Sequence, residues 1–198
     1  AYFMDDFNFT LDSNEFTLNA GVRGNYWSFN NQFLVSPRLS ISLDPNWDKN
    51  YIFRFSGGLY HQPPFFKEFI KRDGSINEDI KAQSSAQLVL GSDYVFEAWD
   101  RPFKLVTEAY YKYLYNIIPY EIDNVRIRYY GENLATGYAA GIDLKINGEF
   151  VKGTESWFSL SIMQTKEDID GDSYANYFNE NGEQVYTASE AVDSNIVY

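Results

Sequence analysis

The sequence contains no cysteine and only one histidine, His61, in 198 residues. These absences exclude a disulfide framework, a thiolate metal centre and a metal site built from several histidines of this chain. Basic residues are also scarce, since 16 lysines and arginines stand against 28 aspartates and glutamates and leave a net charge of −12. Nucleic-acid binding needs a basic surface, so no nucleic-acid partner is expected. No apolar run reaches the roughly 18 residues of a membrane-spanning helix.

Aromatic residues are abundant, at 19% of the chain with 17 tyrosines and 16 phenylalanines, and such residues favour strands. The stretch 137–150 shows the strand pattern most clearly, because apolar and polar residues alternate along it. Its apolar set is Tyr138, Ala140, Ile142, Leu144, Ile146 and Phe150. One face of this strand therefore needs an apolar environment, either a protein core or lipid.

The same alternation predicts strands at 2–11, 16–27, 33–44, 51–61, 83–97, 104–115, 137–150 and 156–166. A short helix is expected after Pro63 and Pro64, and we expect 125–130 to extend the strand at 137–150. The acidic stretch 167–198 is expected to be loop-like, with one strand near 185–188. The predicted fold is all-β, an antiparallel up-and-down meander of about eight strands that forms one domain, 1–198, incomplete at both ends.

Alternate connections of a meander lie at opposite ends, and here their lengths differ by end. Short turns occur near Asp12, Pro45, Trp99 and Lys152 at one end. At the other end the connection at Asn30 is short, and the remaining three, 62–82, 116–136 and the stretch after 166, are long. Aromatic residues flank three of the short turns: Trp47 with Tyr51, Trp99 with Phe103, and Phe150 with Trp157. Short turns at one end, long loops at the other and an aromatic girdle are typical of a transmembrane β-barrel.

Charged side chains are expected on the face that lines the barrel interior, because an arginine at a lipid-facing midplane costs roughly 2 to 4 kcal/mol. The predicted lumen-lining residues are Arg23, Arg38, Arg54, Asp93, Lys104, Glu108, Lys112, Asp143, Lys145 and Glu149.

Several segments together resemble the barrel of TonB-dependent outer-membrane receptors over about 33–166. They are FLVSPRLSISLDP, GGLYHQPPFFKEF, AQLVLGSDYVF, RPFKLVTEAYYKYLYNIIPY and VRIRYYGENLATGYAAGIDLKINGEF. The motifs occur in the order found in such barrels: Ser36–Leu39, Tyr60–Pro63, Glu108–Lys112 and Asn133–Asp143.

The resemblance implies one segment of a bacterial outer-membrane barrel of about 22 strands, closed by a plug domain that this chain does not contain. It implies uptake of a nutrient, which could be a siderophore, a vitamin, a glycan or a peptide. The implied partners are outer-membrane lipid, the missing plug and remaining strands, and the TonB energy-coupling complex. The segment alone would be a curved sheet with two unpaired edges.

Ligand contacts are expected in the outer loops, mainly in the 62–72 loop and where 125–130 meets the wall. The candidate residues are His61, Phe65, Phe66, Arg126, Arg128, Tyr129 and Tyr130. For His61 the competing interpretation is a structural one, a side chain that caps the end of its strand.

No catalytic residue, metal site or cofactor is predicted, and the protein is not expected to be an enzyme. Glu108 with Asp93 or Asp143 could form a glycosidase-like carboxylate pair, but lysines on the same faces make cross-strand ion pairs the better explanation. Asp168, Asp170 and Asp172 could gather calcium, although they lack the spacing of a complete twelve-residue calcium loop.

Two other kinds of protein fit part of the pattern. A soluble β-sandwich adhesin or carbohydrate-binding module would use its tyrosines to stack on sugars. A complete eight-stranded membrane barrel fits the strand count, but nothing in the sequence pairs the first strand with the last convincingly.

Overall fold

The computed structural model describes residues 1–172, 174–181, 184–185 and 193–197. The chain divides into two compact units, Ala1–Asp168 and Ile169–Tyr198. The first unit contains an eight-stranded sheet and a separate two-stranded sheet, and the second is built around a three-stranded sheet.

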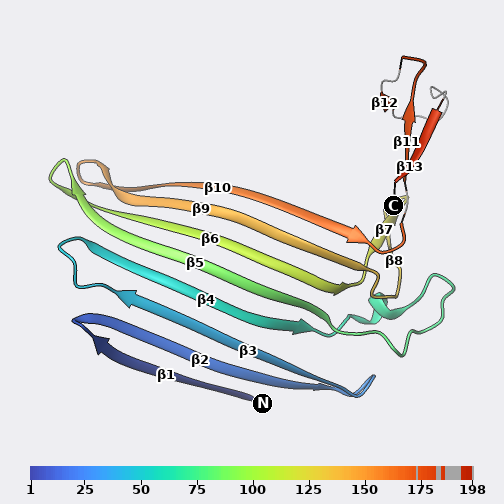
Figure 1. Ribbon diagram of the computed structural model, residues 1–198, viewed down its shortest axis with the longest axis horizontal. Coiled ribbons are helices and arrows are strands. Elements are labelled where there is room, and N and C mark those ends of the chain that lie inside the picture. The colour runs from blue at the N-terminus through green and yellow to red at the C-terminus, as the bar shows by residue number, and fades with distance from the viewer. Residues whose placement is uncertain (173, 182–183, 186–192, 198) are drawn as a thin grey trace. The chain divides into compact units, whose positions relative to one another are not determined.

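The eight-stranded sheet is an antiparallel meander, which confirms the predicted fold class (Figure 1). Each strand lies next to its sequence neighbour, except that β9 follows β6. The strands are β1 (Tyr2–Leu11), β2 (Asn14–Trp27), β3 (Gln32–Asp44), β4 (Asn50–Gln62), β5 (Gln83–Ala98), β6 (Arg101–Ile117), β9 (Ala135–Val151) and β10 (Thr154–Ile169). The expected short helix is also present, as the 3-10 helix η1 (Phe66–Phe69).

Strand register sorts the side chains of this sheet onto two chemically different faces. One cross-strand row, read from β3 to β9, is Ile41, Phe55, Leu90, Ala109 and Ile142. The neighbouring row is Ser42, Arg54, Gly91, Glu108 and Asp143. Because adjacent residues of a strand point to opposite sides, these rows define an apolar face and a polar face.

The apolar face has no covering layer within the described residues. Leu90 and Ile142, in the middle of the sheet, are 53% and 52% exposed. The cluster of buried apolar residues found in the described part lies instead in the connections, at Phe69, Ile80 and Ile118. The sheet is therefore not held together by a core on its apolar face.

The sheet is open. Among the described strands, β1 pairs only with β2, and β10 has only β9 as a neighbour. Two edges consequently present backbone groups without a strand partner, which is the state in which strands pair with other strands.

The two long connections of this unit, 63–82 and 118–134, lie together at one end of the sheet (Figure 1). The short-turn end carries residues 12–13, 45–49, 99–100 and 152–153, and the long-loop end carries 28–31, 63–82 and 118–134. Asp12 with Ser13, and Trp99 with Asp100, have positive φ angles at both turn positions, the geometry of tight two-residue hairpin turns.

The expected extension of β9 by 125–130 is wrong. Arg126–Tyr129 forms β8, which folds back on β7 (Tyr120–Asp123) as a separate hairpin. Asn124 and Val125 both have positive φ and make the tight turn between the two strands. Alternation had indicated an extended segment correctly, but it does not reveal which strand the segment pairs with.

The second unit contains more strand than the loop-like stretch that was predicted. It holds β11 (Tyr174–Phe178), β12 (Gln184–Val185) and β13 (Asp193–Val197), with β11 in the centre. Of the strand expected near 185–188, Val185 belongs to β12, and 186–188 lie outside the described residues.

Candidate functional site

All ten predicted lumen-lining residues lie on the polar face of the sheet. The register places Arg23 opposite Ser36, Arg38 opposite Gly58, and Lys112 opposite Gln87, in rows that continue across the same face. The ten residues come from β2, β3, β4, β5, β6 and β9. They are Arg23, Arg38, Arg54, Asp93, Lys104, Glu108, Lys112, Asp143, Lys145 and Glu149.

Asp93 is the centre of an ion network on this face. Its Oδ1 lies 2.7 Å from Arg54 Nη2, and its Oδ2 lies 2.8 Å from Lys104 Nζ. Arg54 also donates a hydrogen bond to Glu108 Oε1 at 3.4 Å. The Asp93 side chain is only 6% exposed, whereas both of its cationic partners remain partly open to solvent. Asp93 is therefore neutralised by two cations from neighbouring strands.

The sequence anticipated cross-strand ion pairs here but not the role of Arg54. Gly91 stands opposite Arg54, and a Cβ at that position would already lie 3.4 Å from Arg54 Nε. A glycine placed opposite an arginine on the neighbouring strand is thus the sequence feature that could have indicated the role of Arg54. Lys145 forms no ion pair in the described part of the chain, and its Nζ lies 5.7 Å from the Trp157 ring centroid.

Aromatic rings border the apolar face at the short-turn end. A continuous series of ring contacts joins β4, β5, β6 and β9, with centroid separations from 4.2 to 6.0 Å. Its members are Trp47, Tyr51, Phe53, Tyr94, Phe96, Trp99, Phe103 and Phe150. Phe9 and Phe16 stack beside the turn between β1 and β2. We call these ten residues, Phe9 and Phe16 included, the lower belt.

A second group of rings borders the apolar face toward the long-loop end. Tyr26 pairs with Phe33 across β2 and β3, and Tyr113 pairs with Tyr138 across β6 and β9. Tyr111 stacks near Tyr138, with ring centroids 6.1 Å apart. We call these five residues the upper belt. The apolar face is thus aromatic at both ends and mainly aliphatic between them.

The connections at the long-loop end pack against one another around a small apolar core. Phe69, Ile80 and Ile118 are buried together, and Trp27 and Tyr129 pack against them. The 63–82 connection therefore rests on the 118–134 connection and on the end of β2, although these segments are far apart in the sequence.

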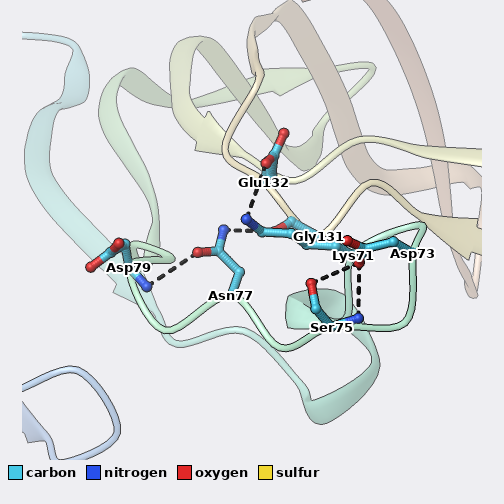
Figure 2. A network of polar contacts seen from close by, with 7 residues as sticks. All are labelled: Lys71, Asp73, Ser75, Asn77, Asp79, Gly131 and Glu132. Atoms are coloured by element: carbon cyan, nitrogen blue, oxygen red, sulfur yellow. Dashed lines mark hydrogen bonds and ion pairs between the residues drawn. The ribbon is translucent and has the colours of Figure 1, made fainter.

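Polar contacts fasten these connections to each other (Figure 2). Asn77 Nδ2 donates to the Gly131 carbonyl at 2.8 Å, and Lys71 Nζ lies 3.5 Å from Glu132 Oε1. Gly131 has a φ of +71°, and a Cβ there would lie 2.7 Å from the backbone of Ile70. Glycine is needed at this position because the two segments of the chain approach too closely for a side chain.

A tight turn inside the 63–82 connection is held by Asp73. Its Oδ1 accepts hydrogen bonds from the Ser75 hydroxyl at 2.7 Å and from the Ser75 amide at 2.9 Å. These two hydrogen bonds hold the pKa of Asp73 below its ordinary value, with a smaller contribution from the nearby Lys71.

The predicted ligand residues occupy different environments. Phe65 and Phe66 are 67% and 65% exposed at the long-loop end. Tyr129 belongs to the loop core, and the Tyr130 ring lies 3.9 Å from the Arg72 guanidinium carbon. Arg126 and Arg128 are exposed on β8.

His61 lies apart from this group because its side chain contacts neighbouring strands of the eight-stranded sheet. Its Nδ1 is 2.7 Å from Ser84 Oγ, and its Nε2 is 3.1 Å from the Val35 carbonyl oxygen. Both ring nitrogens are therefore engaged by neighbouring strands, which agrees with the structural interpretation of this histidine.

No helix among the described residues is long and apolar enough to cross a membrane. The described part of the chain also holds no group of three or more histidine, aspartate or glutamate side chains placed to bind a metal ion.

Comparisons with protein-family models, with curated protein sequences and with solved structures found no match.

Proposed function

We propose that this chain forms part of the wall of a bacterial outer-membrane receptor of the TonB-dependent type, which takes up a nutrient through a plugged β-barrel. The observation that carries the proposal is the division of one sheet into two faces: an uncovered apolar face bordered by two aromatic belts, and a polar face that holds the ten charged residues named above. Asp5, on the edge strand β1, is a charged residue that falls on the apolar face, opposite Ala20. Membrane barrels have this arrangement because lipid contacts one face and water the other.

The spacing of the belts fits the thickness of a bilayer. Ten residue steps separate Phe103 from Tyr113 on β6 and Phe16 from Tyr26 on β2, and twelve separate Tyr138 from Phe150 on β9. At roughly 3.3 Å per residue and a strand tilt of 35–45°, ten steps span about 25 Å along the membrane normal, the height of the apolar band in outer-membrane barrels. The twelve steps on β9 span about 30 Å by the same arithmetic, so the three strands agree to within two residues, which supports a common membrane slab.

The polar face would line the lumen. Lipid exposure of any one of its arginines at the midplane would cost roughly 2 to 4 kcal/mol, whereas a water-filled interior accommodates all of them. The Asp93 network joins β4, β5 and β6 across this face and would stiffen the wall without closing the passage.

The long-loop end would face outward, since outer-membrane barrels have short periplasmic turns and long external loops. The packed connections at that end would meet the nutrient first. The unpaired edges of β1 and β10 would continue into the remaining strands of a barrel of about 22 strands. The plug and the energy-coupling complex would be the partners of that larger assembly.

Site-directed labelling tests which face contacts lipid. Because the chain lacks cysteine, Leu88→Cys and Val89→Cys each create one labelling site on β5, at the same depth but on opposite faces. The full chain, labelled with a small fluorophore, is added to phosphatidylcholine vesicles with brominated acyl chains. We expect bromine to quench the label at position 88, and aqueous iodide to quench the label at position 89.

Two results would overturn the proposal. One is equal or reversed quenching at the two positions, including the case in which the chain stays off the vesicles. The other is a monomer that unfolds cooperatively in plain buffer, which would favour a soluble β-sandwich adhesin or carbohydrate-binding module.

A further inference from the structure

A cavity of about 440 Å³ opens between the 63–82 connection and the β7–β8 hairpin at the long-loop end. Four basic side chains line it: Lys67, Lys71, Arg72 and Arg128. Glu121 is its one acidic lining residue. In a chain with a net charge of −12, this local excess of positive charge departs from the overall composition.

The four basic side chains form only solvent-exposed ion pairs or none. Arg72 lies 2.7 Å from Glu121, Arg128 lies 3.3 Å from Asp123 and Lys71 lies 3.5 Å from Glu132, but the side chains in all three pairs are 36% or more exposed. Exposed pairs of this kind contribute little to stability, so an incoming anion can compete for these cations. Lys67 is exposed and makes no ion pair or side-chain hydrogen bond in the described part of the chain.

The remaining lining of the cavity is apolar and firmly placed. Ile70, Ile127 and Tyr129 supply it, and Tyr129 also packs against the buried loop core. The Tyr129 ring is therefore held in position before any ligand arrives. A ligand with a flat apolar portion could cover these side chains while its charged group meets the cations.

The two walls are tied together independently of any ligand. Asn133 accepts a hydrogen bond from the Lys81 amide at 2.7 Å and donates one to the Lys81 carbonyl at 3.0 Å. Arg72 stacks on Tyr130 and reaches Glu121 across the cavity. A preformed site loses little conformational entropy on binding, which favours the binding of small ligands.

We infer that this cavity binds a soluble organic anion, a small molecule that carries a carboxylate or phosphate group on a flat apolar body. Its volume lies within the roughly 300 to 1,000 Å³ of small-molecule sites. The inference deepens the proposed uptake function by giving the chemical class of the ligand at the loop end. An anionic lipid headgroup offers the same charged group, and we assign the site to a soluble ligand because the apolar lining suits a compact ring.

Phenyl phosphate is the probe. Phenyl β-glucoside is the uncharged control, because it carries the same phenyl ring without the phosphate. The full chain is held in micelles of the uncharged detergent dodecyl maltoside, and binding is measured by calorimetry. We expect phenyl phosphate to bind about tenfold more tightly than the glucoside, and to weaken when salt is raised from about 0.02 to about 0.5 M.

Variants locate the binding. Lys67→Gln and Arg128→Gln should each weaken phenyl phosphate binding about three- to tenfold. Lys152→Gln, which removes the same charge from an exposed turn at the short-turn end, should leave it unchanged. Equal affinity for the two probes, or an equal loss with Lys152→Gln, would overturn the inference.

Two further outcomes are informative. Displacement of phenyl phosphate by a few mole per cent of phosphatidylglycerol in the micelles would reject the soluble ligand in favour of a lipid headgroup. A chain that shows the expected quenching in vesicles but does not bind phenyl phosphate would reject this inference and leave the membrane-wall proposal standing.

Discussion

An arginine placed in the middle of the apolar face should destabilise the sheet in a bilayer much more than the same arginine one residue away. Leu39 lies on the apolar face of β3, between the levels of Phe33 and Leu43, and pairs with Gly57. Ser40 is its neighbour on the polar face, between Asn19 and Ser56. Leu39→Arg and Ser40→Arg therefore add the same side chain at nearly the same depth.

The expected difference follows from the cost of charge in lipid. Leu39→Arg should lower the free energy of unfolding by about 2 to 4 kcal/mol, the cost of a lipid-facing arginine at the midplane. This is a change of roughly 30- to 700-fold in the folding equilibrium. Ser40→Arg has no charged cross-strand partner to repel it and should change stability by no more than about 0.5 kcal/mol.

Urea unfolding of the chain in phosphatidylcholine vesicles, followed by tryptophan fluorescence, measures both variants under identical conditions. Equal destabilisation by the two arginines, or a larger effect of Ser40→Arg, would refute the assignment of faces. The comparison is internal to one strand, so a general intolerance of added charge cannot imitate the expected result.

Two predictions concern the connections and turns. Gly131→Ala should destabilise the loop core by about 2 kcal/mol or more and speed protease cleavage of 63–82, because its Cβ would meet the Ile70 backbone. Gly153→Ala, with a φ of +80° but open space around it, should cost only about 1 kcal/mol; equal effects would contradict the clash. Ser75→Ala should raise the pKa of Asp73 toward its ordinary value in a carboxyl NMR titration. The folded-state pKa of Asp73 is depressed, so its stabilising contribution is present above the unfolded pKa and is lost as pH falls through the folded pKa; an unchanged titration would refute the role of Ser75.

The two faces of the sheet could be predicted from the sequence because side-chain alternation is a local property. A residue such as Leu90 or Glu108 takes its face from its position in the strand, whatever the strand pairs with. The short 3-10 helix after Pro63 and Pro64 was likewise predictable from its immediate neighbours. Residues 126–129 show the limit, since they were recognised as extended but assigned to the wrong sheet.

The loop end and the Asp93 network could be predicted only in part. The 62–72 loop and Arg126 to Tyr130 were recognised as candidate binding segments, but nothing local indicates that Asn77 meets Gly131 or that Arg72 meets Glu121. These contacts join segments about 50 residues apart and depend on how the connections fold over the strand ends. Arg54 was placed on the correct face, while its position between Asp93 and Glu108 follows from the register of three strands.

The strands of the main sheet, the face on which each of their side chains lies and the end at which each connection falls follow from the sequence alone. Side-chain alternation and connection length are local properties of the chain. Contacts between residues of different segments appear only in the folded chain: the pairing of β8 with β7, the cation-lined cavity and the Asp93 network. Those contacts depend on register, on tight turns such as the one at Asn124 and Val125, and on the close approach that Gly131 permits, and each of these joins residues that the sequence keeps apart.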